Sequence, residues 1–108
     1  MIEYEDFAKL DIRMGTILAV EPVPETDKLL QLTIDLGEEK PRTLVSGIRE
    51  YFGEPEVLVG HQVPVIVNLK PRTLKGVTSE GMVLYVVSEE MLTTLSPKTK
   101  VPNGTPVR

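Results

Sequence analysis

The sequence predicts a small all-β barrel built from five short strands. Apolar and polar residues alternate along several short segments, and this period of two is typical of strands with one buried face. Turn-forming residues separate the segments, with 9 prolines and 8 glycines among the 108 residues. Only one segment between strands is predicted to be a short helix, so we expect sheet to form the core.

Five segments are expected to form strands: residues 13–20, 28–36, 42–46, 62–67 and 82–87. The second has the clearest alternation, and the fifth, which is nearly all apolar, should be the most buried. Gly15 in the first predicts a bulge or a sharp bend, which allows a small sheet to coil. Pro64 in the fourth has no N–H to donate, so it predicts an edge position or a bulge.

The other segments are predicted to be short helices, turns and irregular structure. One helical turn is expected at residues 47–52, between the third and fourth strands, and a short helix or turn within residues 1–11. Residues 88–108 should form an extension with one or two short strands and a tight turn at Asn103-Gly104. Five strands with this helix fit an OB-fold best, with an SH3-like barrel as the competing fold.

One domain is expected over residues 1–108, with its core barrel at about 12–87, because this length is near the commonest domain size. The start is acidic, so no signal peptide is expected, and no apolar run approaches the ~20 residues that span a bilayer. The lack of cysteine excludes disulfides and favours a reducing compartment. We therefore expect a cytoplasmic location and no membrane partner.

Catalysis has little support in the sequence. The one histidine, His61, lies in an expected turn, where a solvated side chain is commoner than a base. Ser46 and Ser79 have no base beside them, and the common nucleotide-binding and zinc-hydrolase motifs are absent. The pairs Glu38-Glu39 and Glu89-Glu90 are better explained by solvation than by Mg²⁺ binding. We expect no catalytic residue, no metal site and no cofactor.

Charge is distributed unevenly along the chain, whose net charge is −4. Residues 1–39 contain 10 acids and 3 bases, residues 40–79 contain 3 acids and 6 bases, and residues 80–108 contain 3 of each. Salt screens charges over about 8 Å, so a local cationic surface can attract a polyanion although the total charge is negative. The acidic remainder should restrict such binding to that surface.

The strongest candidate for a cationic surface is the segment 68–82. It contains Lys70, Arg72 and Lys75 and no acid before Glu80. Four further side chains can hydrogen-bond to phosphate or sugar oxygens: Asn68, Thr73, Thr78 and Ser79. The segment lies between two expected strands, so it is either a platform for a polyanion or a solvated hairpin loop.

Aromatic residues are few, and their expected positions limit the kind of nucleic acid that the protein could bind. Proteins that bind single strands stack bases on exposed rings. Here Tyr85 is the only ring within an expected strand, and its apolar neighbours predict burial. Core packing is expected for the other rings considered: Tyr4, Phe7, Tyr51 and Phe52. The sequence therefore favours recognition of phosphates, 2′-hydroxyls and overall RNA shape over stacking.

Six segments carry a family resemblance: Phe7-Ala-Lys-Leu-Asp-Ile-Arg13, Asp27-Lys-Leu-Leu30, Leu36-Gly37, Arg42-Thr-Leu-Val-Ser-Gly-Ile48, Asn68-Leu-Lys-Pro71 and Gly76-Val-Thr-Ser-Glu-Gly-Met82. In this order they resemble the tRNA-binding domain of free-standing dimeric proteins and of the C-terminus of bacterial methionyl-tRNA synthetases. The chain is also similar to archaeal methionyl-tRNA synthetase beta subunits and to cofactors of the endothelial monocyte-activating polypeptide type. Val101-Pro-Asn-Gly-Thr105 resembles the end of the same domain.

The resemblance implies an OB-fold that binds the outer corner of tRNA as an affinity module of, or cofactor for, methionyl-tRNA synthetase. The implied tRNA contacts are Lys28, Arg42, Ser46, Asn68, Lys70, Arg72, Lys75, Ser79, Glu80 and Met82. Glu80 could instead stabilise the loop cations, and Met82 could belong to the core. The implied partners are tRNA, a second copy joined through residues 1–6 and 88–108, and the catalytic subunit of the synthetase.

The resemblance leaves two other classes of function open. Export chaperones of the CsaA type share Lys-Leu-Asp-Ile-Arg and the Pro-Asn-Gly-Thr ending, and bind peptide in a groove. They usually depart from Ser-Glu-Gly-Met and Asp-Lys-Leu-Leu, both of which this chain contains, so tRNA is favoured over peptide. The third class is a purely structural dimerisation domain of a larger synthetase.

Overall fold

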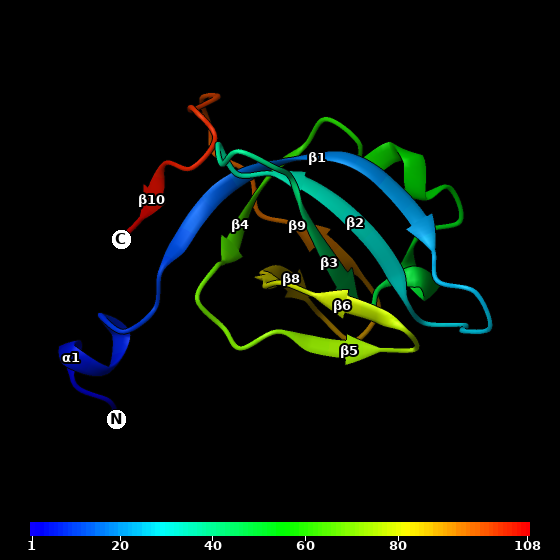
Figure 1. Cartoon of the computed structure of the whole chain (residues 1–108), viewed down its shortest axis with the longest axis horizontal. Coiled ribbons are helices and arrows are strands. Elements are labelled where there is room, and N and C mark those ends of the chain that lie inside the picture. Colours follow the sequence, from blue (N-terminus) through cyan, green and yellow to red (C-terminus); the bar gives the residue numbers. More distant parts are fainter.

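The structure, a computed structural model that describes residues 1–108, is organised around one curved antiparallel sheet (Figure 1). Five strands cross it in the order β3-β2-β1-β4-β7, and β10 pairs with the start of β1. Their bounds are Ile12–Pro22 for β1, Leu30–Asp35 for β2, Arg42–Ser46 for β3, Gln62–Ile66 for β4, Met82–Val83 for β7 and Pro106–Val107 for β10. The sheet curls until β3 meets the segment before β7, so the five strands nearly close into a barrel. The predicted OB-type barrel is confirmed.

The long strand β1 belongs to both halves of the barrel. Its first part pairs with β4 from Ile12 to Thr16, and its second part pairs with β2 from Thr16 to Pro22. Gly15 lies at this change of partner, where an added Cβ would be 2.6 Å from Ile34 Cγ2. The bulge that Gly15 predicts is found further along, at the register shift around Leu18. Glycine is needed at position 15 because β2 crosses so closely.

The core lies inside the barrel that this curled sheet forms. The alternation predicted for residues 28–36 is confirmed, since Leu30, Leu32 and Ile34 are fully buried and Leu36 is nearly so. Side chains from β1, β3, β4 and β7 complete the cluster, together with Ile48 and Leu58 from the connection between β3 and β4. Burying each such side chain contributes about 1.5–3 kcal/mol. The core therefore fixes the curvature that brings distant segments together.

The most buried strand is β4, in which all five residues are buried, and not the segment 82–87 as predicted. That apolar segment is interrupted at Leu84, and its second part leaves Val86 and Val87 exposed. Pro64 lies within β4, between β1 and β7, so it is not on an edge strand. Its carbonyl accepts from Leu84 N. The proline, which has no N–H to donate, thus faces the interruption of the neighbouring strand.

Two small hairpins and three short helical segments complete the fold. The hairpins pair β5 (Arg72–Leu74) with β6 (Val77–Ser79) and β8 (Tyr85–Val87) with β9 (Leu92–Thr94); the helical segments are α1 (Tyr4–Phe7), the 3-10 helix η1 (Arg49–Tyr51) and the 3-10 helix η2 (Pro55–Leu58). The helical turn predicted at residues 47–52 is confirmed as η1. The second, η2, is not predicted by the sequence, which indicates one helical turn between the third and fourth strands. Proline is favourable there as the first residue of a helix, where its missing N–H costs nothing.

The two ends of the molecule differ in what they contain. Along the longest axis, both termini lie at one end, with α1 extending away from the barrel (Figure 1). The turn of the β5–β6 hairpin and the β1–β2 loop lie towards the other end. The extension 88–108 contains the two short strands β9 and β10, as predicted. No helix is long and apolar enough to cross a membrane.

Candidate nucleic-acid interface

The cationic segment 68–82 forms a hairpin instead of an open loop. β5 and β6 pair along their whole length, and the hydroxyls of Thr73 and Thr78 lie 3.1 Å apart across the pair. Lys75 and Gly76 connect the strands with φ angles of +50° and +83°. Positive φ at both central residues is typical of the type I′ turn, whose twist matches that of the strands it joins. The turn places Lys75 at the tip of the hairpin.

Three cations of this segment have no partner within the protein. Lys70, Arg72 and Lys75 are exposed, and none of them makes an ion pair or a side-chain hydrogen bond. Lys70 and Arg72 line one small cleft of about 70 Å³, which Met82 also lines. Met82 is 47% exposed, so it belongs to the surface and not to the core. An unpaired cation can bind a phosphate oxygen without first breaking a contact.

Arg42, by contrast, has its guanidinium engaged inside the protein. Its Nε and Nη2 each donate to a carboxylate oxygen of Glu38 at 2.8 Å. Its Nη1 donates to the carbonyls of Val67 at 2.7 Å and Glu80 at 3.0 Å. The hydrogen bonds to Glu38 raise the pKa of Arg42 above its ordinary value. Arg42 therefore connects the β2–β3 turn to the ends of β4 and β6.

Ser79 and Glu80 connect β6 to β3 and close the barrel. Ser79, only 6% exposed, accepts through Oγ from Val45 N at 2.9 Å and donates to the carbonyl of Gly81 at 3.1 Å. Glu80 N donates to the carbonyl of Thr43 at 2.8 Å, and its carboxylate accepts from Thr43 N at 3.4 Å. The carboxylate of Glu80 thus contacts β3 and makes no ion pair with the hairpin cations.

Asn68 and Ser46 also use their polar atoms within the chain. Asn68 Nδ2 donates to the carbonyl of Lys9 at 2.7 Å, and its Oδ1 accepts from Asp11 N at 2.9 Å. These bonds attach the N-terminal segment to the end of β4. Ser46 is 9% exposed, and its Oγ accepts from the hydroxyl of Tyr85 at 3.0 Å. Both side chains stabilise the barrel around the hairpin.

Lys28 is exposed and lies before β2, in the β1–β2 loop, not within the strand as expected. Its carbonyl accepts from Arg49 N at 3.0 Å, and the guanidinium of Arg49 donates to the carbonyl of Thr26. The 3-10 helix η1 therefore fixes the loop that presents Lys28. The ammonium of Lys28 has no partner in the protein.

The aromatic rings are more exposed than the sequence predicts. Tyr4 is 77%, Phe7 39% and Tyr51 43% exposed, whereas Phe52 packs against the core. Tyr85 is partly buried, as expected. Tyr51 was missed because η1 has only three residues, too few for a periodic pattern to distinguish a buried face from an exposed one. The inference against base stacking, which assumed buried rings, loses this support.

A nearly closed five-stranded barrel with an unpaired cationic hairpin defines the class of protein as an OB-type module suited to a polyanion. The sequence model of the family described as "Putative tRNA binding domain" matches residues 12–106. The methionine–tRNA ligase of Methanosarcina mazei is 49% identical over 109 aligned positions, which cover 100% of this chain and 15% of the ligase. The chain belongs to this family of tRNA-binding domains.

Solved structures agree with this family and include two kinds of protein. A MetRS-related protein from Pyrococcus horikoshii has a TM-score of 0.91 at 31% identity, covering 100% of this chain and 98% of that one. The chaperone CsaA from Bacillus anthracis has a TM-score of 0.88 at 35% identity, covering 100% and 99%. This chain spans only 12–16% of the length of the methionine–tRNA ligases it matches. The family consists of binding domains, and most of the ligase has no counterpart in this chain.

Proposed function

We propose that this chain binds folded tRNA at its outer corner through the β5–β6 hairpin, as the tRNA-affinity module of, or a cofactor for, methionyl-tRNA synthetase. The family supports tRNA as the ligand. The similarity to a segment of the Methanosarcina mazei ligase supports the connection with the synthetase, whose catalytic subunit would be a partner in the cytoplasm. The chain itself acts by binding and not by catalysis.

The observation that carries this proposal is the division of the candidate residues into two groups. One group is exposed and unpaired: Lys28, Lys70, Arg72, Lys75 and Met82. The other group has its polar atoms engaged within the protein: Arg42, Ser46, Asn68, Ser79 and Glu80. We assign tRNA contact to the first group. The second group fixes the hairpin against the barrel, so that the cations keep the spacing that a folded RNA backbone requires.

The test is fluorescence anisotropy with folded tRNA and a single-stranded RNA of equal length, at several salt concentrations. The wild type should prefer folded tRNA. Lys70→Ala, Arg72→Ala and Lys75→Ala should each weaken binding and flatten the log–log salt slope by roughly 0.7–0.9, because each removes one phosphate contact. Lys98→Ala, which removes an exposed lysine in the extension, is the matched control.

Two further results distinguish the roles of the groups. Ser79→Ala should lower the free energy of unfolding by about 1–3 kcal/mol, because Val45 N loses its partner, and should leave the salt slope unchanged. An unchanged slope in the triple variant of Lys70, Arg72 and Lys75 would exclude the hairpin as the tRNA site. Binding of an unfolded peptide without tRNA would favour the CsaA-type function, which the similarity to the Bacillus anthracis chaperone keeps as the alternative.

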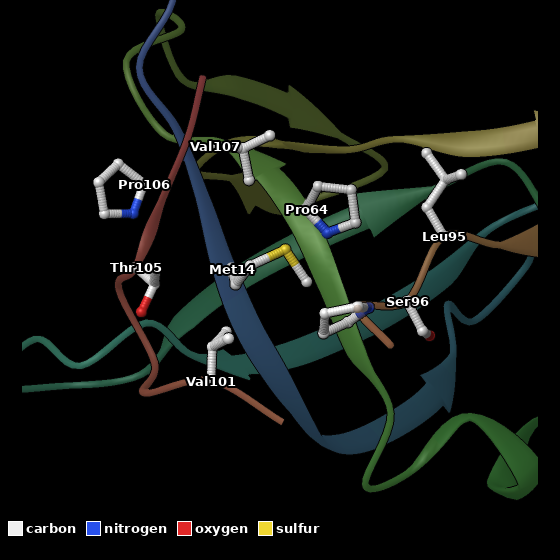
Figure 2. A pocket seen from close by; sticks show the side chains of 9 residues that line it. Met14, Pro64, Leu95, Ser96, Val101, Thr105, Pro106 and Val107 are labelled. Atoms are coloured by element: carbon white, nitrogen blue, oxygen red, sulfur yellow. The ribbon is translucent and has the colours of Figure 1, made fainter. Parts of the chain in front are cut away.

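We further propose that the chain forms a homodimer through the end that contains both termini. An apolar groove of about 400 Å³ lies there, with Met14 and Pro64 between the C-terminal strand and Leu95 (Figure 2). Leu95 and Val107 on its rim are 41% and 38% exposed. All of residues 1–10 are exposed, including apolar side chains that a single copy leaves uncovered. A second copy would cover both surfaces, which is how apolar patches of this kind are usually used.

A further inference from the structure

A second groove lies beside the cationic cleft, between β3, the 3-10 helix η1 and the β8–β9 hairpin. Its volume is about 290 Å³, near the lower end for sites that bind small organic groups. Most of its lining is apolar or aromatic, and includes Ile48, Tyr51, Met82, Tyr85 and Leu92.

The groove is continuous with the cleft that contains the unpaired cations. Val45 and Met82 line both of them. Lys70 and Arg72 lie on one side of Val45 and Met82, and the aromatic groove lies on the other. A ligand that crosses Met82 would therefore have an anionic part at the cations and an apolar, planar part in the groove. A nucleotide has these two parts joined by one sugar.

The two tyrosines of the groove are arranged differently. Tyr85 is fixed, because its hydroxyl donates to Ser46 Oγ at 3.0 Å and its ring packs against the core. Tyr51 is 43% exposed, and its hydroxyl makes no hydrogen bond within the protein. An exposed ring on a short, anchored helix can stack on a base at little entropic cost. Met82, unbranched and polarisable, can adapt to the edge of such a base.

We propose that this groove takes one unstacked base of the tRNA, stacked on Tyr51, while Lys70 and Arg72 bind the adjoining phosphates. The inference rests on the tRNA binding proposed above and adds to it a site for a single base. A peptide strand that extends the sheet fits the groove less well, because this mode of binding needs free backbone groups along the sheet edge. The backbone N–H of Val45, which lines the groove, is already donated to Ser79 Oγ.

The test compares Tyr51→Ala, Tyr51→Phe and the control Val57→Ala, which removes an exposed apolar side chain on η2, outside the proposed tRNA and dimer surfaces. Affinity is measured by anisotropy for folded tRNA and for a fully paired RNA duplex, which offers no free base. Tyr51→Ala should weaken tRNA binding about fivefold to a hundredfold, the range found for base–aromatic stacking. The salt slope should stay unchanged, because no phosphate contact is lost. Tyr51→Phe, which keeps the ring, and Val57→Ala should bind as the wild type does.

On the paired duplex, Tyr51→Ala and the wild type should bind equally. If Tyr51→Ala binds tRNA as tightly as the wild type while Lys70→Ala and Arg72→Ala bind weakly, the base site is wrong and the tRNA function stands. If the wild type itself does not bind tRNA, both proposals fail. In that case, loss of peptide binding in Tyr51→Ala would assign the groove to a peptide.

Discussion

The hydroxyl of Tyr85 is the clearest example of a side chain whose chemistry is set by its neighbours. Burial raises its pKa from 10.0 to about 12, and the hydrogen bond to Ser46 lowers it by a smaller amount. The ring therefore stays neutral well above physiological pH. Its O–H remains available to donate to Ser46 Oγ, which connects β8 to the end of β3.

This pKa predicts a loss of stability in alkali. The unfolded chain releases the proton of Tyr85 near pH 10, whereas the folded chain keeps it up to about pH 12. The free energy of unfolding should therefore be unaffected by this group below about pH 10 and fall by about 2–3 kcal/mol between pH 10 and 12. Urea unfolding of the wild type and of Tyr85→Phe across this range measures the difference.

Tyr85→Phe should cost about 1 kcal/mol at about pH 8, because one hydrogen bond is lost. The variant should then lose less stability than the wild type between pH 10 and 12, since it has no proton to release at this position. An equal fall in both proteins would mean that other groups cause the alkaline transition.

At the scale of the element, the connection between β6 and β7 depends on Gly81. Its φ of +156° is unfavourable for other residues, and an added Cβ would lie 2.8 Å from the carbonyl oxygen of Ile66 and 3.3 Å from Val65 Cγ1. Gly76, at the hairpin tip, also has a positive φ of +83°, but no atom lies within 4 Å of its Cβ position. A substitution at Gly81 would therefore meet both an unfavourable φ and close neighbours, whereas one at Gly76 would meet only the unfavourable φ.

Gly81→Ala should lower the free energy of unfolding by about 2–4 kcal/mol, because strain and collision add. Gly76→Ala should cost only about 1 kcal/mol, from strain alone. Urea unfolding of the two variants tests this difference. Equal costs would show that β7 can move away from β4 without a loss of stability, and that the close contact between Gly81 and Ile66 does not limit the side chain at position 81.

Local sequence was sufficient to predict some strands and insufficient to predict others. The bounds of β3 were predicted to the residue, because Pro41 precedes the segment and Gly47 follows it. The segment 82–87 was predicted as one buried strand because apolar content does not reveal pairing. Its interruption at Leu84 faces Pro64 of another strand, which only the assembled sheet brings opposite.

The same limit applies to the candidate site. Residue type and the family resemblance identified the cations of the hairpin. They did not indicate which polar side chains are already engaged, because the partners are far away in the chain. Asn68 contacts Lys9, 59 positions earlier, and Arg42 contacts the carbonyl of Glu80, 38 positions later. Closure of the barrel creates these contacts, so they follow from the fold and not from local pattern.

At the scale of the whole molecule, the proposed functions lie at different ends. Arg72 and Lys75 belong to the β5–β6 hairpin and Lys28 to the β1–β2 loop, whereas the exposed apolar side chains among residues 1–10 and the groove of Figure 2 lie with the termini (Figure 1). A dimer formed through the terminal end would leave both hairpins accessible. It would also place two cationic surfaces on one particle, which raises the local concentration of tRNA sites.

Light scattering tests the dimer directly. The wild type should have twice the mass of one chain, 12.0 kDa, or about 24 kDa. Leu95→Lys should give a mass of 12.0 kDa, because it places a charge on the apolar groove, and its unfolding midpoint should equal that of the wild type diluted until it dissociates, since Leu95 is 41% exposed within one copy. Val57→Lys, at a 53% exposed residue of η2, should remain dimeric. A wild-type mass of 12.0 kDa at every concentration would exclude the dimer.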